Sequence, residues 1–87
     1  SFVNGIYYGE YFDNPNKNDV NIWHLNIITF EKRIAYTFPK GVLNHIHNLI
    51  YDEIEDKILV LAGDFEHSAS MWLVEDNYKK INLIKKK

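Results

Sequence analysis

The sequence contains no cysteine, two prolines and four glycines among its 87 residues. Without cysteine there is no disulfide framework and no thiolate nucleophile or ligand, so the redox compartment is left open. The formal net charge of −2 is too small to indicate a nucleic-acid partner. No apolar run is long enough to span a bilayer, and no phosphate loop, nucleophile elbow or zinc-finger spacing is present. The sequence therefore indicates no membrane partner, no nucleic acid and no cofactor.

Large apolar side chains, by contrast, are abundant. The chain has six tyrosines, five phenylalanines and two tryptophans, together with many isoleucines. A chain of this length forms at most one small domain with a thin core. Because such a core cannot easily hide so much apolar surface, we expect part of it to face a partner.

The apolar runs predict strands rather than helices. β-Branched and aromatic residues crowd these runs, a spacing of three to four residues is rare, and turn-forming residues separate one run from the next. The expected strands span residues 5–12, 20–27, 33–38, 44–52, 57–65, 69–75 and 80–84. The predicted fold class is all-β, built from antiparallel meanders.

A weak internal repeat organises these strands. Gly9-Glu10-Tyr11 is similar to Gly63-Asp64-Phe65, 54 residues later, and Ile22-Trp23 is similar to Met71-Trp72, 49 residues later. A unit of roughly fifty residues lies within the range of propeller blades. Because the two tryptophans hold equivalent positions, we expect both in the core.

The two units differ in completeness, because only the second has an opening strand. We expect residues 1–43 to form a partial propeller blade and residues 44–87 a complete four-stranded one, together a segment of one larger propeller domain. Two such sheets cannot close a ring. The remaining blades would come from more of the natural chain or from other copies of this one.

One stretch carries a family resemblance. NHIHNLIYDEIEDKILVLAGDFEHSASMWLVEDNYKKINLI resembles a blade of the sialidase-like propellers with BNR repeats: a His-rich opening strand, an acidic turn, an apolar strand ending in Gly-Asp, and a strand-turn-strand at the family's Asp box. The upstream YYGEYFDNPNKNDVNIW is similar to the later strands of a preceding blade. In the Asp box, Ser-x-Asp-x-Gly-x-x-Trp, only Asp76 of Val74 to Ile81 agrees.

The resemblance implies a carbohydrate-active or carbohydrate-binding parent protein, with a glycosidase-like enzyme among the candidates. A catalytic sialidase needs a cluster of arginines for its substrate carboxylate, and Arg33 is the one arginine here. No activity is expected of this segment alone. The rival interpretation is a non-enzymatic propeller scaffold or a module that assembles with copies of itself.

His45 and His47 are the first candidates for a ligand site. Strand residues two apart project to the same face, so both imidazoles could converge on a sugar hydroxyl or a metal. The sequence fixes no third ligand, and no metal is assigned. The alternative is a pair of strand-end histidines hydrogen-bonded to neighbouring loops.

In a meander the returning strand brings Asp64 and His67 to the end where the histidines start, and Glu10 reaches the same end. Glu10, His45, His47, Asp64 and His67 are therefore the expected ligand-binding residues of this end. Glu10 and Asp64 could serve as a catalytic carboxylate pair, as in glycoside hydrolysis. Alternatively, each carboxylate accepts backbone N–H bonds from the loop that follows.

The remaining polar and aromatic candidates separate by position. Tyr8 and Tyr11 are weak candidates for exposed rings that stack on a sugar. The acidic turn 53–56, with Asp76 and Lys79, falls at the opposite end, where we expect only solvated turns.

Overall fold

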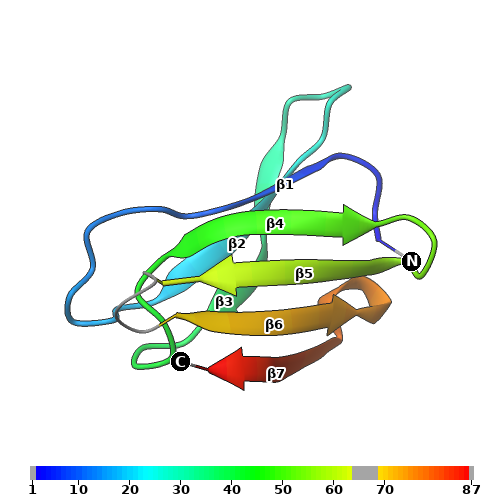
Figure 1. Ribbon diagram of the computed structural model, residues 1–87. Coiled ribbons are helices and arrows are strands. Elements are labelled where there is room, and N and C mark those ends of the chain that lie inside the picture. The colour runs from blue at the N-terminus through cyan, green and yellow to red at the C-terminus, as the bar shows by residue number, and fades with distance from the viewer. Residues whose placement is uncertain (1, 64–68, 87) are drawn as a thin grey trace.

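The computed structural model describes residues 2–63 and 69–86, and most of these residues lie in seven β-strands (Figure 1). Three strands form one antiparallel sheet in chain order: β1 (Ile6–Gly9), β2 (Val20–Leu25) and β3 (Lys32–Phe38). Four form the second: β4 (Ile46–Asp52), β5 (Lys57–Ala62), β6 (Ser70–Glu75) and β7 (Lys80–Lys86), with the short 3-10 turn η1 (Asp76–Tyr78) between the last two. The predicted all-β class with antiparallel meanders is confirmed. Across the described residues, no helix has the length and apolar character needed to cross a membrane.

The core lies between the two sheets, which form two layers with the four-stranded sheet in front in Figure 1. Alternation produces it: in β2 every second residue is buried, beginning with Val20, and in β5 every second residue is buried, beginning with Ile58. Phe38, Leu43 and Val74 complete the best-buried part. Each sheet therefore has one face in the core and one face turned outward.

The sheets meet where β1 crosses the start of β4. The backbone N–H of Ile46 donates to the carbonyl of Glu10 (2.9 Å). Gly9 lies directly against Ile46, so a Cβ at this glycine would overlap the isoleucine side chain. The missing side chain thus permits the close approach of the two sheets.

The internal repeat is present in the strand pairing. The β2–β3 register shifts between Ile22 and Trp23, and the β6–β7 register shifts between Met71 and Trp72. These irregularities fall 49 residues apart, at the positions that the sequence repeat aligns.

The repeat aligns differently in the preceding strand. Tyr8 pairs with Trp23, whereas Val60 pairs with Trp72. Glu10, whose backbone N–H donates to Asn21, therefore corresponds by pairing to Ala62, the partner of Ser70. The similarity of the two glycine motifs does not follow the register, because Gly9 comes directly after the partner of Trp23, whereas Gly63 comes three residues after the partner of Trp72.

The two equivalent tryptophans face different surroundings. Trp72 packs against the core, with its ring centroid 5.3 Å from that of Phe38. Trp23 alternates with the buried Ile22 and is half-buried on the outward face, where the Lys32 ammonium lies 4.6 Å from its ring centroid. The expectation of a core position holds for Trp72 and is wrong for Trp23. The two sheets stack in the same orientation, so the face that carries the tryptophan points into the core from the four-stranded sheet and away from it in the three-stranded sheet.

Tyr78 should make the fold sensitive to alkaline pH. Its hydroxyl is buried and has no hydrogen-bond partner among the described residues, and burial raises the pKa of Tyr78 above its ordinary value of 10.0. Above pH 10 the unfolded chain releases this proton while the folded chain retains it, so ionisation of Tyr78 leaves stability unchanged below pH 10 and lowers it as pH rises toward the folded pKa. At pH 7 we expect Tyr78→Phe to have the same free energy of unfolding as the unmodified chain, or one higher by up to about 1 kcal/mol, measured with urea. Above pH 10 it should lose less stability than the unmodified chain.

The exposed substitution Tyr8→Phe is the matched control for the loss of one phenol. A Tyr78→Phe protein that loses stability above pH 10 as steeply as the unmodified chain would contradict the assignment.

Candidate functional site

Loops from both sheets meet at the end where β4 begins. The buried Asn14 side-chain amide donates to the carbonyls of Asn44 (2.9 Å) and Asn18 (3.0 Å), and Gly41 N–H donates to Lys17 O (2.7 Å). These bonds tie the loop before β2 to the segment that enters β4. The two loop-rich segments therefore form one rim of the molecule.

At this rim, His45 and His47 lie beside the ring of Tyr11. Their ring centroids are 4.5 Å and 6.0 Å from that of Tyr11. His45 is buried and His47 is exposed, while Tyr11 keeps 66% of its surface accessible. An exposed phenol ring with two imidazoles next to it is suited to a ligand with an apolar face and hydroxyl groups.

Simple alternation does not produce this arrangement. β4 begins at Ile46, after His45, and its register shifts between Ile46 and Asn48, so His47 is the extra residue of a bulge. The two histidines are brought together through Tyr11, which the sequence suggested only as an exposed ring.

Glu10 lies next to Tyr11 in the chain, but its carboxylate is turned toward β2. Oε1 accepts the backbone N–H of Asn21 (2.7 Å), and Oε2 accepts the indole N–H of Trp23 (3.0 Å). In the second sheet the indole N–H of Trp72 is bound instead by Ser70 Oγ (2.9 Å). Both oxygens of Glu10 thus hold β1 against β2, and their donors come from a neighbouring strand rather than from the loop that follows.

Two expected members of this rim, Asp64 and His67, lie in residues 64–68, outside the described residues. The rim is therefore described through Glu10, His45 and His47. Within residues 2–63 and 69–86, no group of three or more His, Cys, Asp or Glu side chains is placed to hold a metal ion.

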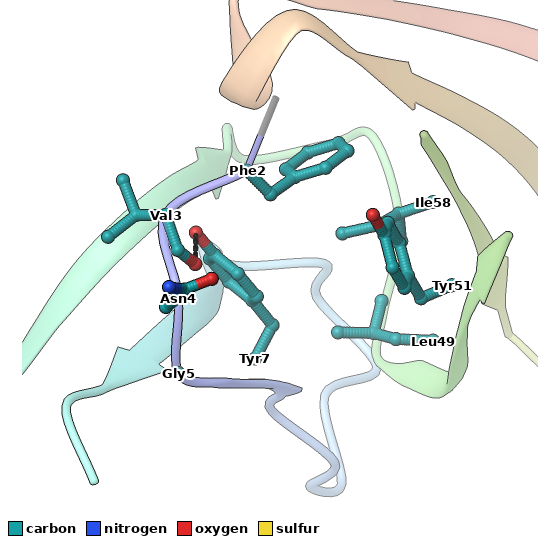
Figure 2. Close-up of a pocket in the computed structure, with 8 residues that line it drawn as sticks. All are labelled: Phe2, Val3, Asn4, Gly5, Tyr7, Leu49, Tyr51 and Ile58. Carbon is teal, nitrogen blue, oxygen red and sulfur yellow. Dashed lines mark hydrogen bonds between the residues drawn. The ribbon is translucent and has the colours of Figure 1, made fainter. Parts of the chain in front are cut away.

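A pocket of about 240 Å³ lies at the other end of β4, where the sequence suggested only solvated turns. Figure 2 shows the rings of Phe2, Tyr7 and Tyr51 around it, with Leu49 between the two tyrosines and the chain from Val3 to Gly5 along one side. Ile58 of β5 completes the lining. Sequence reasoning missed the pocket because Tyr51 is far from Phe2 and Tyr7 in the chain and meets them only where the two sheets approach each other.

The wall formed by residues 2–5 is fixed to the three-stranded sheet. The buried His24 donates from Nε2 to Asn4 O (2.7 Å), and Tyr7 Oη donates to Val3 O (3.0 Å). Gly5 adopts φ +139, and a Cβ there would collide with His24, so this close approach requires glycine. Burial raises the pKa of the Tyr7 phenol, although the charge of Arg33 opposes the shift.

The opposite wall carries negative charge. Tyr51 Oη donates to Asp56 Oδ1 (2.7 Å), and this hydrogen bond is the main cause of the raised pKa of Tyr51. The charges of Glu53 and Asp52 act in the same direction. Asp52 also accepts the N–H of Ile54 (2.9 Å), which closes the acidic turn beside the pocket.

The described chain thus offers two places for a ligand, the Tyr11 rim and the aromatic pocket, one at each end of β4. Comparison with protein-family models, curated proteins and solved structures finds no match to this chain. The function is therefore argued from the geometry of these places and from the repeat.

Glu10→Gln should destabilise the fold. A glutamine side chain has one oxygen acceptor and one NH₂ donor. Its NH₂ group would face one of the two N–H groups that now donate to the carboxylate, so that hydrogen bond would be lost. We expect a loss of about 1–3 kcal/mol in the free energy of unfolding, measured with urea.

Glu31→Gln, at an exposed position between β2 and β3, is the matched control and should change stability by less than about 0.5 kcal/mol. Removing the indole N–H first, with Trp23→Phe, should reduce the effect of Glu10→Gln. Equal stability of Glu10→Gln and the unmodified chain would show that the carboxylate has no structural role.

Proposed function

We propose that this chain is a segment of a sialidase-like, BNR-type β-propeller, with residues 1–43 in an incomplete blade and residues 44–87 in a complete one, and that it binds carbohydrate at the Tyr11 rim. The observation that carries the proposal is the direction in which the two sheets face. The carbohydrate part rests on the rim itself.

In a propeller each blade is rotated about a central axis, so the front of one blade packs against the back of the next. Equivalent residues then point the same way around the axis. Trp72 points toward the three-stranded sheet, and its equivalent Trp23 points away from the four-stranded one. Ile22 and Met71 have the reverse arrangement. A two-fold sandwich would instead turn both tryptophans inward.

Both outward faces are apolar, as expected for blade faces that neighbouring blades would cover in a complete propeller. The face of the three-stranded sheet, called here the front face, carries Ile6, Tyr8, Trp23, Leu25 and Ile34. The face of the four-stranded sheet, called here the back face, carries Ile50, Leu59, Leu61, Met71 and Leu73. Contiguous apolar surface of this kind on a soluble domain indicates an interaction site.

The turn between β6 and β7 supports the family resemblance. It joins the third and fourth strands of the complete blade and contains Asp76. This is the location at which the resemblance implies an Asp box. The equivalent turn of the first sheet, between β2 and β3, is closed by Asn26 Oδ1, which accepts the N–H of Ile28 (2.9 Å).

The exposed ring of Tyr11 supports carbohydrate as the ligand class. Its face suits the apolar face of a pyranose, and the adjacent exposed His47 can exchange hydrogen bonds with sugar hydroxyls. Because both oxygens of Glu10 are bound to β2 and Arg33 is the one arginine of the sequence, we propose binding rather than catalysis for this segment, whatever the parent protein does.

Binding to immobilised glycans should depend on the Tyr11 ring. We expect Tyr11→Ala to weaken the glycan-array signal about tenfold, because stacking area is lost, and Tyr11→Phe to retain it. His47→Ala should also weaken binding, because it removes an exposed imidazole that can exchange hydrogen bonds with sugar hydroxyls. If the unmodified chain binds no glycan, or Tyr11→Ala binds as well as Tyr11→Phe, the carbohydrate proposal is wrong.

A second candidate function, a self-assembling or scaffold module, is favoured by the front and back faces themselves. A front face on one copy fits a back face on the next, which is a heterologous contact that repeats head to tail. The occupant we propose for each face is therefore a second copy of this chain, or an equivalent blade of its parent.

Charge substitutions distinguish head-to-tail stacking from other association. Ile34 on the front face and Ile50 on the back face are each 45% exposed. Ile34→Lys alone and Ile50→Glu alone should each be monomeric, with a mass by light scattering near the 10.3 kDa of one chain. Their mixture should form a dimer and stop there, because each variant keeps one intact face.

The matched control is Ile54→Glu, because Ile54 lies in the β4–β5 turn, off both faces, with 96% of its surface exposed. This variant should associate like the unmodified chain. A monomeric unmodified chain at millimolar concentration, or a mixture that stays monomeric, would exclude head-to-tail assembly.

A further inference from the structure

We propose that the pocket beside Tyr51 binds a methylated ammonium group, an organic cation enclosed by three aromatic rings next to an acidic turn. The pocket lies at the opposite end of β4 from the Tyr11 rim. Its argument does not depend on the propeller or on carbohydrate binding.

The geometry of the three rings suits a bound cation. Phe2 stands nearly perpendicular to Tyr51, at 88° with centroids 6.0 Å apart, and to Tyr7, at 73° with centroids 6.1 Å apart. Rings in this arrangement form different walls of one box, as Figure 2 shows. A cation within about 6 Å of an aromatic face is attracted by the electrons of the ring, and several such faces add their attraction.

Acidic residues lie beside the rings. Asp52 ends β4, Glu53 and Asp56 lie in the turn that follows, and Asp56 accepts the Tyr51 hydroxyl. These carboxylates place negative charge next to the aromatic walls, where it attracts a cation.

Lys57, which follows this turn, lies between two carboxylates. The Lys57 ammonium lies 3.7 Å from both the Glu55 and the Glu75 carboxylates, so it is shared with an acid of another strand. Arg33 acts on Tyr7 from β3, in the other sheet. Asp52 ends β4, and Glu53, Glu55 and Asp56 stand in the turn that follows it.

The lining and the size of the pocket suit a methylated group. Leu49, Ile58 and Val3 offer methyl groups, and Asn4 is the one polar side chain among the lining residues apart from the two phenols. An unmethylated ammonium is strongly hydrated and needs several acceptors, whereas a methylated one presents apolar carbon to such walls. At about 240 Å³ the pocket is smaller than the roughly 300–1,000 Å³ of drug-sized sites, which suits a headgroup.

The test is calorimetric titration of the 87-residue chain with choline, with a peptide carrying trimethyl-lysine, and with the neutral isostere of choline in which carbon replaces nitrogen. We expect choline or the peptide to bind at least about tenfold more tightly than the neutral isostere, because only a cation gains from the rings and the acids. Tighter binding of the peptide would indicate a protein-borne lysine, and tighter binding of choline a free small molecule. The proposal is overturned if neither cation binds, or if the neutral isostere binds equally well.

Variants of the half-exposed Tyr51 separate the ring from its hydroxyl. Tyr51→Leu should weaken cation binding about tenfold, whereas Tyr51→Phe keeps the aromatic face and should retain it to within about threefold. Asp56→Asn should weaken binding of the cation and leave the neutral isostere unchanged. If all of these variants keep their glycan binding, the two ends of β4 act separately. Equal cation binding by Tyr51→Leu and Tyr51→Phe would contradict the aromatic cage.

Discussion

The close crossing of β1 over β4 is the contact on which the rest of the structure depends. Gly9 has no side chain, so Ile46 packs directly against the backbone of β1, and its N–H bonds to the Glu10 carbonyl. The crossing sets how the two sheets face each other. It also brings Tyr11 to His45 at one end of β4 and Tyr7 toward Tyr51 at the other. Both candidate sites are consequences of this one approach of two strands.

The way in which equivalent faces of the two sheets point links the fold to the proposed function. A face that is buried in one sheet is turned outward in the other, as the equivalent pair Trp23 and Trp72 illustrates. An arrangement of this kind leaves two unlike apolar faces rather than two identical ones. It therefore supports the proposal that similar sheets stack one on another, and it differs from a two-fold sandwich.

The sequence predicted what depends on local pattern and missed what depends on crossing and register. Residue type and turn spacing were enough for the strands, and the structure places register shifts before both tryptophans that the repeat aligns. The outward position of Trp23 was missed, because a repeat aligns residues without saying which neighbour each face meets. The role of Glu10 depended on the indole N–H across the strand pair, and the pocket on Phe2 meeting Tyr51 from the far end of the chain. Neither contact has a local signal.

Cross-linking measures the central claim, that unlike faces of successive sheets pack together, most directly. Because the chain has no cysteine, Ile34→Cys and Ile50→Cys each introduce a single thiol, one on the front face and one on the back face. Oxidation of an equal mixture of the two variants should give mainly the disulfide between unlike variants, identified by mass. Predominant disulfides between like variants would mean that identical faces pair, and would contradict a head-to-tail, propeller-like arrangement.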